Sequence, residues 1–445
     1  MQKRPVPTRE LQFPLEALPT PKGQLLAPLG PESKASAYGV APGDLALCMV
    51  GGKKKGARQS WLRQVLEPGV GRQEAPCPHF GFCGGCSFQH LNYQRQLRLK
   101  TGALEERLRQ LEEGVEIWPA QGAPTPWYYR SKVEFSFIKE DLGFNLRGLF
   151  QKVTPVRECL IAPPPNRQIL ERVRQWQKKY ALPGWDPRLN EGLLRYLIVR
   201  YSFYKRQFLV ALVTTTPAPQ NQAADPALWQ ELAQSLMAIP GAQGVIHVYH
   251  DGLSPVASGQ SEELLAGKEE IIERVNDLEF SLGWRSFFQS NPPAYAQMLA
   301  QARRWVGPQE KILDLYCGVG SIGLSLEGDL VGVESVPQAI ANAQANARRL
   351  GRKAQFHCAN SEDWPDLKAS LIIIDPPRSG CHPSLIQRLL KEGSPTLLYI
   401  SCNFSRFWEE YQSLKEAYRL ERVQFYDFFP HTPHLESLLL LRRRP

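Results

Sequence analysis

The sequence predicts a multidomain α/β protein, and three stretches of contrasting pattern support this fold class. From residue 284 onward, short apolar strands alternate with amphipathic helices, as in KILDLYC, QAIANAQANARRLG and LIIIDPP, which is typical of a doubly wound sheet covered on both faces. Residues 127–280 contain mainly strand-like segments such as KVEFSFI and FLVALVTTT, which indicates a largely antiparallel α+β domain. The first 72 residues are rich in proline, glycine and short β-like runs, which favours a small β-barrel of about five strands.

These patterns place two domain boundaries in a chain of 445 residues, a length that accommodates roughly three domains. Residues 1–72 are expected to form the barrel, residues 73–280 the central α+β domain and residues 281–445 the doubly wound domain. An amphipathic helix is expected at 91–115, in LNYQRQLRLKTGALEERLRQLEE. It belongs to the central domain, and packing against the C-terminal domain is an open alternative.

Composition narrows the class of protein. The chain has 53 Lys and Arg against 44 Asp and Glu, and the resulting charge of +9 is compatible with a polyanionic partner. Lys53, Lys54, Lys55 and Arg58 form a basic tip in the barrel, which either grips phosphates or is a solvated lysine loop. No apolar run approaches the roughly 18 residues of a membrane span, and the N-terminus lacks an apolar signal region, so a cytoplasmic location is expected.

Nine cysteines in such a chain point toward metal ligation or catalysis rather than disulfides. In CPHFGFCGGCSFQH, Cys77, Cys83 and Cys86 follow the spacing C-x5-C-x2-C, and Cys159 in VRECLIAPP is the best candidate for a fourth ligand. Four cysteines hold either tetrahedral zinc or a [4Fe-4S] cluster. The absence of a second C-x2-C pair favours the cluster, in a structural or RNA-positioning role.

A glycine-rich turn follows the apolar strand in ILDLYCGVGSIGLSL. Gly318, Gly320 and Gly323 allow a tight strand-to-helix turn and close approach of a cofactor, and Glu334 at the next strand end could bind ribose hydroxyls. A dinucleotide and S-adenosylmethionine both suit such a loop. The turn Asp375-Pro376-Pro377-Arg378 after a later strand favours S-adenosylmethionine, because methyltransferases often carry an acid-Pro-Pro turn beside the methyl donor.

Cys402 lies where the apolar segment TLLYIS ends and a helical pattern begins. The carboxyl ends of strands line the ligand crevice of an open α/β sheet, so a thiol there could meet a substrate. Taken alone, a buried core cysteine is an equally good interpretation.

Taken in order, the motifs resemble one family. The segments CPHFGFCGGCSFQHLNYQRQLRLK, YRSKVEFSF, FFQSN, DLYCGVGSIGL, DPPRSG, YISCN and FFPHTPHLESLLLL follow a TRAM-like barrel in the order found in bacterial RNA uracil-5-methyltransferases. The chain is most similar to the iron-sulfur branch that modifies 23S ribosomal RNA. This resemblance covers nearly the whole chain. It implies a TRAM/OB-like barrel, a central domain with an iron-sulfur cluster and a Rossmann-like catalytic domain.

The resemblance also implies roles for individual residues. Four cysteines would bind a [4Fe-4S] cluster: Cys77, Cys83, Cys86 and Cys159. Six residues would contact S-adenosylmethionine: Gln289, Tyr316, Ser321, Glu334, Asn360 and Asp375. Cys402 would be the nucleophile and Glu436 the general base. RNA is the partner implied, and neither a membrane nor a protein partner is expected.

The chemistry of uracil explains why these residue types are needed. C5 is a poor nucleophile, so a thiolate first adds to C6 and converts the ring into an enolate. After methyl transfer, the hydrogen on C5 must be removed by a base before the thiolate can leave. The nucleotide must also leave the stack, or lie in a loop, for either group to reach it.

One departure from the family pattern lies beside the nucleophile. Family members usually continue the Cys-Asn pair with Pro and a Thr two residues later, whereas this chain has Phe404-Ser405-Arg406. The chemistry is kept, but the supporting turn has changed. Three alternatives stay open: the same reaction on transfer RNA, a cytosine-5-methyltransferase, and a non-catalytic RNA-binding or assembly factor that retains the fold.

Overall fold

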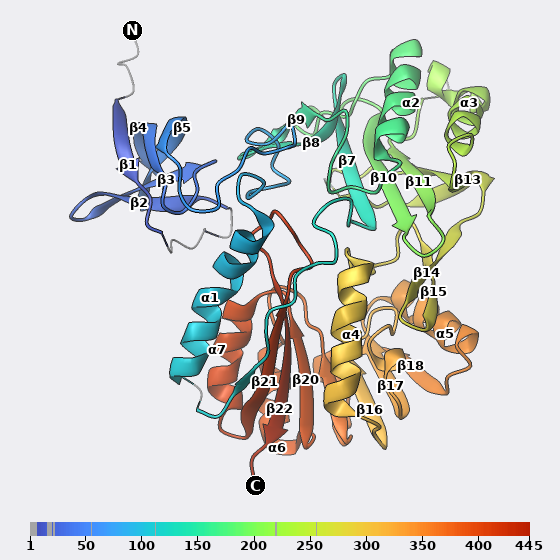
Figure 1. Cartoon of the computed structure of the whole chain (residues 1–445). Coiled ribbons are helices and arrows are strands. Elements are labelled where there is room, and N and C mark those ends of the chain that lie inside the picture. The colour runs from blue at the N-terminus through green and yellow to red at the C-terminus, as the bar shows by residue number, and fades with distance from the viewer. Residues whose placement is uncertain are drawn as a thin grey trace. The chain divides into compact units, whose positions relative to one another are not determined.

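A computed structural model describes residues 7–445 except 16–19, 21–22, 55, 112, 219 and 255 (Figure 1). The chain divides into two compact units, each built from separate stretches. The first unit contains Met1–Leu111, Asn145–Phe150 and Phe429–His434, and the second contains Glu112–Phe144, Gln151–Phe428 and Leu435–Pro445. The domain boundaries expected after residues 72 and 280 remain predictions.

The first unit begins with a five-stranded sheet. Its strands are β1 (Thr8–Gln12), β2 (Leu25–Gly30), β3 (Ser33–Tyr38), β4 (Leu45–Lys54) and β5 (Ala57–Glu67), in the order β1-β4-β5-β3-β2. Strands β3 and β5 are parallel, while β1–β4, β4–β5 and β2–β3 are antiparallel. Phe13, Ala35 and Cys48 are buried in its core, so Cys48 has a packing role. The TRAM/OB-like character of this sheet remains a prediction.

The first unit also contains the loop with Cys77, Cys83 and Cys86, called the cysteine loop below, and the helix that follows it. Helix α1 (Tyr93–Leu111) lies within the range expected for it. The segment 429–434 belongs to the same unit, because the His431 carbonyl accepts a hydrogen bond from the Ser87 amide (2.7 Å) and the Gln96 side chain accepts one from the His431 amide (3.0 Å). His431 is therefore part of the packing of this unit.

The second unit contains a seven-stranded sheet in the order β13-β12-β11-β10-β7-β8-β9. Its strands are β7 (Lys132–Ile138), β8 (Asp141–Leu146), β9 (Leu149–Pro155), β10 (Leu194–Ser202), β11 (Gln207–Thr214), β12 (Ala242–Tyr249) and β13 (Ser261–Gly267). Strands β11 and β12 are parallel, and four other pairs are antiparallel. The remaining elements are α2 (Asn166–Lys179), η1 (Gln222–Ala224), α3 (Pro226–Met237) and the antiparallel hairpin β14 (Glu270–Val275) and β15 (Leu278–Gly283).

The second unit also contains an eight-stranded sheet in the order β18-β17-β16-β19-β20-β22-β21-β6. Its strands are β6 (Glu116–Ile117), β16 (Lys311–Leu315), β17 (Asp329–Glu334), β18 (Ala354–Cys358), β19 (Leu371–Ile374), β20 (Thr396–Ser401), β21 (Tyr418–Tyr426) and β22 (Glu436–Arg443). Strands β16 to β20 are parallel, and β22 is antiparallel to both β20 and β21.

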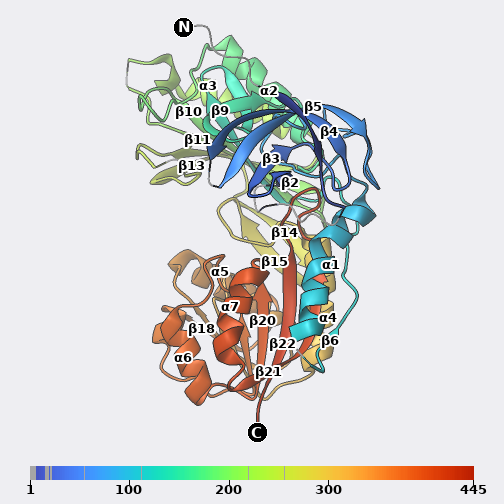
Figure 2. The same cartoon turned by 90° about the vertical axis from the view of Figure 1, so that its left-hand side faces the viewer.

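Helices cover both faces of this sheet, as the alternating pattern predicts. They are α4 (Pro292–Val306), α5 (Pro337–Arg349), α6 (Pro383–Glu392) and α7 (Phe404–Leu414), with short turns η2 (Gly323–Ser325) and η3 (Ser361–Asp363). Figure 2 shows α4 on one side of the sheet and α6 and α7 on the other. Every residue of β19 and β20 is buried, because these central strands are covered on both faces. The mixed α/β fold is confirmed.

The strand order reverses between β16 and β19, since β17 and β18 extend the sheet in one direction and β19 and β20 extend it in the other. Ligands of open α/β sheets bind outside the carboxyl ends of the strands at such a switch point. Among the described residues, no helix combines the length and apolar character needed to cross a membrane.

Candidate active site at the carboxyl edge of the eight-stranded sheet

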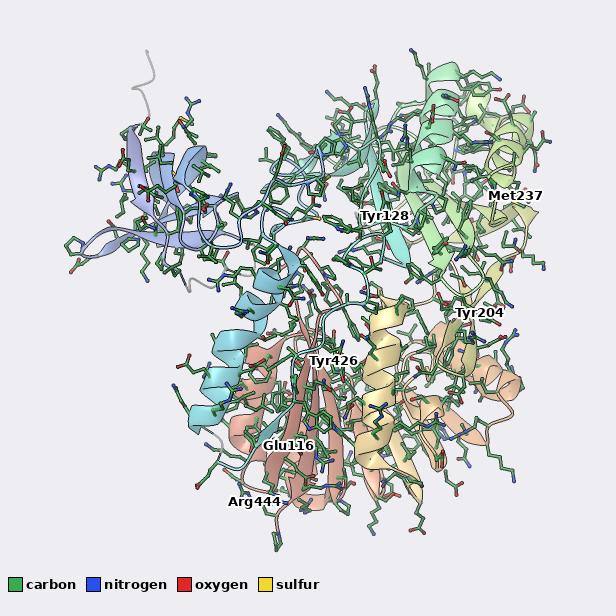
Figure 3. The ribbon with its side chains drawn as sticks, in the orientation of Figure 1. Glu116, Tyr128, Tyr204, Met237, Tyr426 and Arg444 are labelled. Atoms are coloured by element: carbon green, nitrogen blue, oxygen red, sulfur yellow. The ribbon has the colours of Figure 1, made fainter. Side chains whose placement is uncertain are left out.

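Five predicted site residues lie at one edge of the sheet. Tyr316 follows β16, Glu334 ends β17, Asp375 follows β19 and Cys402 follows β20. Glu436 is the first residue of antiparallel β22, so it lies at the same edge as the carboxyl ends of its parallel neighbours. Tyr426, labelled in Figure 3, is directly opposite Glu436 in the strand register and marks this edge.

The glycine-rich turn has a backbone that few residue types adopt. Gly318 and Gly320 have φ angles of 54° and 77°, and Tyr316 has a φ of 61°, which is a strained value for a residue with a side chain. The Glu334 carboxylate accepts a hydrogen bond from the Gly318 amide at 3.2 Å. A Cβ atom on Gly323 would lie 2.6 Å from Leu330, so the close helix–strand packing requires glycine. The turn is thus fixed beside Glu334.

A pocket of about 430 Å³ opens beside this turn. Its lining includes Tyr316, Asn360, Pro377 and Arg406, so it brings together two of the predicted cofactor contacts. The Asn360 side chain is exposed and donates a hydrogen bond to Asp363 at 2.8 Å. The pocket lies at the carboxyl edge, where open α/β sheets bind their ligands.

Of the six predicted cofactor contacts, Gln289 lies just before α4 and Ser321 lies in the glycine turn. Ser321 is 2.7 Å from the hydroxyl of buried Tyr295, which is a hydrogen-bond distance. Gln289 is partly exposed, and its carbonyl accepts a hydrogen bond from the Ser131 hydroxyl at 3.2 Å. The structure thus ties the backbone of Gln289 to Ser131 and the Ser321 side chain to α4.

The Cys402 thiol is surrounded by three charged groups. Burial, together with the charges of Glu436 and Asp375, raises the pKa of Cys402 to about 11, although the charge of Arg378 and a hydrogen bond from its side chain lower it. Cys402 and Glu436 thus lie close enough for their charges to interact. The thiol is protonated at neutral pH in this structure, and Arg378 is the cation that favours its ionisation.

The two carboxyl groups near Cys402 compete for the same proton. Burial raises the pKa of Asp375 to about 7 and raises that of Glu436 well above its ordinary value. Repulsion from Asp375 raises the pKa of Glu436 further, and Arg378 opposes this effect. Two neighbouring buried carboxylates avoid double ionisation, so the pair retains a proton near neutral pH. A carboxylate of this kind is a stronger base than a solvated one.

Sequence reasoning missed three features of this edge. Asp314 is fully buried in β16, and burial raises its pKa to about 8 although the Gly323 amide donates a hydrogen bond to it at 3.0 Å. Phe287 is 73% exposed two residues before Gln289, which is unusual for a large apolar side chain. Arg378 was noticed only as part of the Asp-Pro-Pro-Arg turn. An acid inside an apolar strand was the available signal for Asp314.

The cysteine loop is held by one arginine within the first unit. The Arg147 side chain donates hydrogen bonds to the carbonyls of Cys83, at 3.1 Å, and of Cys86. Burial lowers the pKa of Arg147, and the charges of Tyr38, Cys83 and Cys86 oppose that shift. A Cβ on Gly84 would lie 3.1 Å from a backbone carbonyl, so the loop packs closely there.

The four predicted cluster ligands are divided between the two units. Cys77, Cys83 and Cys86 belong to the first unit, whereas Cys159 lies in the second, where its amide donates a hydrogen bond to Asn166 at 2.8 Å. Within the described ranges, no group of three His, Cys, Asp or Glu side chains is arranged to hold a metal ion. The predicted cluster therefore has no support from geometry.

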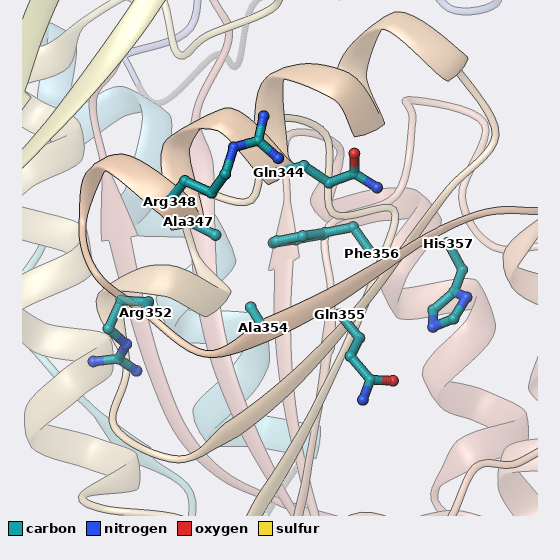
Figure 4. Close-up of a pocket in the computed structure, with 8 residues that line it drawn as sticks. All are labelled: Gln344, Ala347, Arg348, Arg352, Ala354, Gln355, Phe356 and His357. Carbon is teal, nitrogen blue, oxygen red and sulfur yellow. The ribbon is translucent and has the colours of Figure 1, made fainter.

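A second pocket, of about 480 Å³, lies between α5 and the edge strand β18 (Figure 4). Arg348, Arg352, Phe356 and His357 are among its lining residues. None of the predicted site residues lines it. The chemistry predicted from the sequence is therefore concentrated at the carboxyl edge of the sheet and not in this pocket.

Comparisons with known proteins identify the family of the chain. A family model described as tRNA (uracil-5-)-methyltransferase matches residues 342–444. Uncharacterized RNA methyltransferases of Clostridium tetani and Bacillus cereus are 31% and 30% identical over 420 and 425 residues, covering 91% of each chain. The crystal structure of Pyrococcus abyssi tRNA (uracil-54, C5)-methyltransferase in complex with S-adenosyl-L-homocysteine superposes with a TM-score of 0.78 at 26% identity, covering 97% of this chain and 99% of that one. The chain belongs to the RNA uracil-5-methyltransferase family of S-adenosylmethionine-dependent enzymes.

Proposed function

We propose that the protein transfers a methyl group from S-adenosylmethionine to C5 of a uridine in 23S ribosomal RNA, through a covalent bond between Cys402 and C6 of the base. The observation that carries the proposal is the meeting of Cys402, Glu436, Asp375 and Arg378 at one sheet edge, where each carboxyl group changes the pKa of the thiol. A thiol, a base and a cation at a switch-point crevice are the groups that the reaction needs.

Cys402 begins the reaction in this proposal. Its thiolate forms a bond to C6, and the electron pair of the C5–C6 double bond moves onto C5 and the neighbouring carbonyl. Arg378 favours the thiolate by charge and by a hydrogen bond. S-adenosylmethionine would supply the methyl group: C5 takes it up with its electron pair as the bond from the methyl carbon to the sulfonium sulfur breaks, and S-adenosylhomocysteine leaves. The base then carries both a methyl group and a hydrogen at C5.

Glu436 completes the reaction by removing that hydrogen as a proton. The electron pair of the C5–H bond restores the C5–C6 double bond, and the bond from C6 to the Cys402 sulfur breaks. Burial and Asp375 keep the pKa of Glu436 well above its ordinary value, so its ionised form is a strong acceptor for this proton. Asp375 is thus proposed to tune the base as well as to contact the methyl donor.

The methyl donor is proposed to lie along the glycine turn and the pocket beside it. Glu334, held by the Gly318 amide, is placed for ribose hydroxyls, and Tyr316 and Asn360 line the pocket. Gln289, Ser321 and Asp375 complete the proposed set, with Gln289 three residues before α4, Ser321 bonded to Tyr295 and Asp375 after β19. The strained Tyr316 backbone supports this assignment, because such strain concentrates at functional sites.

The five-stranded sheet is proposed to be the TRAM-like RNA-binding module. Lys53, Lys54 and Arg58 are exposed where β4 and β5 meet, and Lys55 lies outside the described residues. Trp61 on β5 is 52% exposed beside these cations. Basic side chains with an exposed aromatic ring bind single-stranded RNA by phosphate contacts and base stacking.

The [4Fe-4S] cluster stays a proposal based on the resemblance and the cysteine spacing. Cys77, Cys83, Cys86 and Cys159 would supply its ligands, and no catalytic step depends on it. Anaerobically purified protein should show the broad absorbance near 400 nm typical of such clusters, with matching iron and sulfide. Zinc without sulfide would instead support the tetrahedral zinc site.

The nearest alternative is the same reaction on transfer RNA. Two comparisons favour it, because the matching family model and the Pyrococcus abyssi enzyme both carry transfer RNA in their descriptions. The cysteine set and the TRAM-like sheet favour ribosomal RNA through the resemblance. A non-catalytic RNA-binding factor is disfavoured, because such a protein has no need for Cys402 beside a high-pKa base.

A direct test offers both RNAs to the purified protein. Transcripts of 23S ribosomal RNA and of transfer RNA are incubated with methyl-labelled S-adenosylmethionine, and nucleosides are analysed by mass spectrometry for 5-methyluridine. The Cys402→Ala variant is the control. Label confined to 23S RNA supports the proposal, and label confined to transfer RNA establishes the alternative. No labelled uridine in either RNA, or full activity of Cys402→Ala, overturns the mechanism.

A further inference from the structure

The first half of the loop after β19 is hydrogen-bonded to the N-cap residue of α7. The Asn403 side chain donates a hydrogen bond to the Arg378 carbonyl at 3.2 Å, and its oxygen lies 3.4 Å from the Arg406 amide that it caps. Arg378 is the residue whose charge and side-chain hydrogen bond lower the pKa of the Cys402 thiol. The backbone of Arg378 is therefore fixed by the residue that directly follows the nucleophile.

The second half of the same loop is tied to α7 by a buried carboxylate. Glu410 accepts a hydrogen bond from the Cys381 amide at 2.9 Å and another from the Tyr399 hydroxyl at 2.7 Å. Glu410 is 6% exposed and Tyr399 is 1% exposed, so both bonds are shielded from water. A buried carboxylate needs a compensating cation as well as hydrogen bonds.

Arg406 supplies that cation. Its Nε lies 3.2 Å from Glu410 Oε1, and its terminal nitrogen bonds Glu409 at 3.0 Å. Gly380 packs directly on the pair, because a Cβ on Gly380 would lie 2.0 Å from Glu410 Oε1 and 2.6 Å from Arg406 Nε. The φ of Gly380 is 84°, which also favours glycine. The loop is thus shaped around this ion pair.

Arg406 belongs to the turn that departs from the family pattern. Phe404 in that turn is buried against Phe425, with ring centroids 5.4 Å apart. Arg406 lies one helical turn before Glu410. Arg406 also lines the pocket that contains Tyr316 and Asn360. The altered turn therefore contacts both the loop of Arg378 and the predicted cofactor pocket.

We propose that Arg406 and Glu410 are positioning residues, which hold loop 376–381 against α7 and thereby keep the Arg378 guanidinium at the Cys402 thiol. This inference rests on the proposed role of Cys402. Neither residue touches the reacting atoms, and both act through Arg378. The changed turn after Cys402 is in this view a different support for the same nucleophile.

The proposal predicts a change in the ionisation of Cys402. The charged groups that face the thiol are Glu436 at the start of β22 and Asp375 and Arg378 after β19. If Arg378 moves away, only the two carboxyl groups remain, and the thiol ionises at higher pH. Each unit of increase lowers the thiolate fraction about tenfold at a pH below the pKa.

The test measures alkylation of Cys402 by iodoacetamide as a function of pH, with the Cys402 peptide quantified by mass spectrometry. Arg378→Met sets the full effect of losing the cation. Arg406→Met and Glu410→Gln are each expected to shift the profile to higher pH and to slow alkylation at pH 8 about tenfold. Arg406→Lys keeps the positive charge and should restore most of the rate. Arg419→Met, at an exposed arginine of β21, should match the unchanged protein.

Wild-type profiles for Arg406→Met and Glu410→Gln would overturn the proposal, as would an unshifted profile for Arg378→Met. If Glu410→Gln does not fold, the comparison of Arg406→Met with Arg406→Lys decides alone. A purely structural role would alter the melting temperature and leave the alkylation pKa in place. The assay contains neither RNA nor methyl donor, so its result is independent of whether the protein methylates uridine.

Discussion

The Cys402 thiol and the loop of Cys83 and Cys86 each lie near an arginine, and Cys402 also has two buried carboxyl groups beside it. Cys402 faces two carboxyl groups, which add to the effect of burial in raising its pKa. Cys83 and Cys86 lie beside a cation, because Arg147 bonds both of their carbonyls and its charge interacts with both thiols. Carboxyl groups thus lie beside the Cys402 thiol, and a guanidinium lies beside the cysteine loop.

The difference matches what each thiol is proposed to do. A nucleophile that must leave again is best kept as a thiol until its substrate arrives, and the carboxyl pair near Cys402 has this effect. Metal ligands stay ionised throughout, and a neighbouring guanidinium stabilises them. In the proposed function, the same residue type would serve two chemistries in these two surroundings.

Removing the base at Cys402 should give the largest effect. We expect Glu436→Gln to lower the rate of methylation about a thousandfold, within the usual range for loss of a general base. The first bond should still form, because Glu436 acts in the proposed sequence only after methyl transfer. The enzyme should therefore accumulate as a covalent adduct with methylated RNA, which denaturing gels with labelled RNA will detect.

The double variant Cys402→Ala, Glu436→Gln is the matched control, and it should give no adduct. A Glu436→Gln protein that turns over normally, or that stalls without any covalent species, would contradict the role of Glu436. In that case Glu436 would still raise the pKa of Cys402, but it would not be the base of the reaction.

An intermediate effect is expected when the cation of the other region is removed. Arg147→Met loses two hydrogen bonds to the carbonyls of Cys83 and Cys86, and a guanidinium 4.8 Å from the Tyr38 ring centroid. We expect the free energy of unfolding to fall by about 2 kcal/mol, since partly buried bonds from a charged donor are worth more than neutral ones. Urea unfolding followed by circular dichroism measures the change.

Arg109→Met is a suitable control, because Arg109 is 62% exposed and its ion pair with Glu105 at 3.5 Å is of the weak surface kind. It should change stability by a few tenths of a kcal/mol at most. Equal losses for the two variants would mean that the cysteine loop does not depend on Arg147.

The sequence was most informative where a motif reflects a backbone requirement. Gly318 and Gly320 have positive φ angles, and Gly323 has no room for a side chain, so the glycine pattern recorded geometry directly. The short apolar runs likewise predicted strands whose carboxyl ends carry Asp375 and Cys402. Such features are local in the chain, which is why they can be read from it.

Long-range features were not predictable in the same way. The segment 429–434 packs with the first unit although the residues on both sides of it belong to the second, and nothing in FFPHTPH signals this. The ion pair of Arg406 and Glu410 looks like an ordinary helix-surface pair in sequence, and only the close approach of Gly380 gives it a role. Burial, which sets the pKa of Asp375 and Glu436, also depends on packing between distant segments.

The smallest expected effect is on the pH dependence of stability. It tests whether Asp314, buried inside the sheet, retains a proton as the carboxyl groups near Cys402 do. Asp314 has a pKa raised to about 8 by burial, and that of Asp375 is about 7. The folded chain therefore keeps protons that the unfolded chain has lost above about pH 4. The contribution of these two groups to stability is greatest below that pH and falls as pH rises from about 4 to their folded pKa values of about 7 and about 8, by up to about 1.4 kcal/mol per pH unit for each group.

Replacing Asp314 by a neutral isostere separates its share from that of the crevice. Asp314→Asn cannot ionise, yet it can still accept the hydrogen bond from the Gly323 amide, so the decline in unfolding free energy between pH 6 and 7.5 should become shallower by up to about 1.4 kcal/mol per pH unit. Asp329→Asn, at the exposed start of β17, should leave the slope unchanged. An unaltered slope in Asp314→Asn would show that Asp314 is ionised in the folded protein, which would confine the proton-retaining carboxyl groups to Asp375 and Glu436 beside the nucleophile.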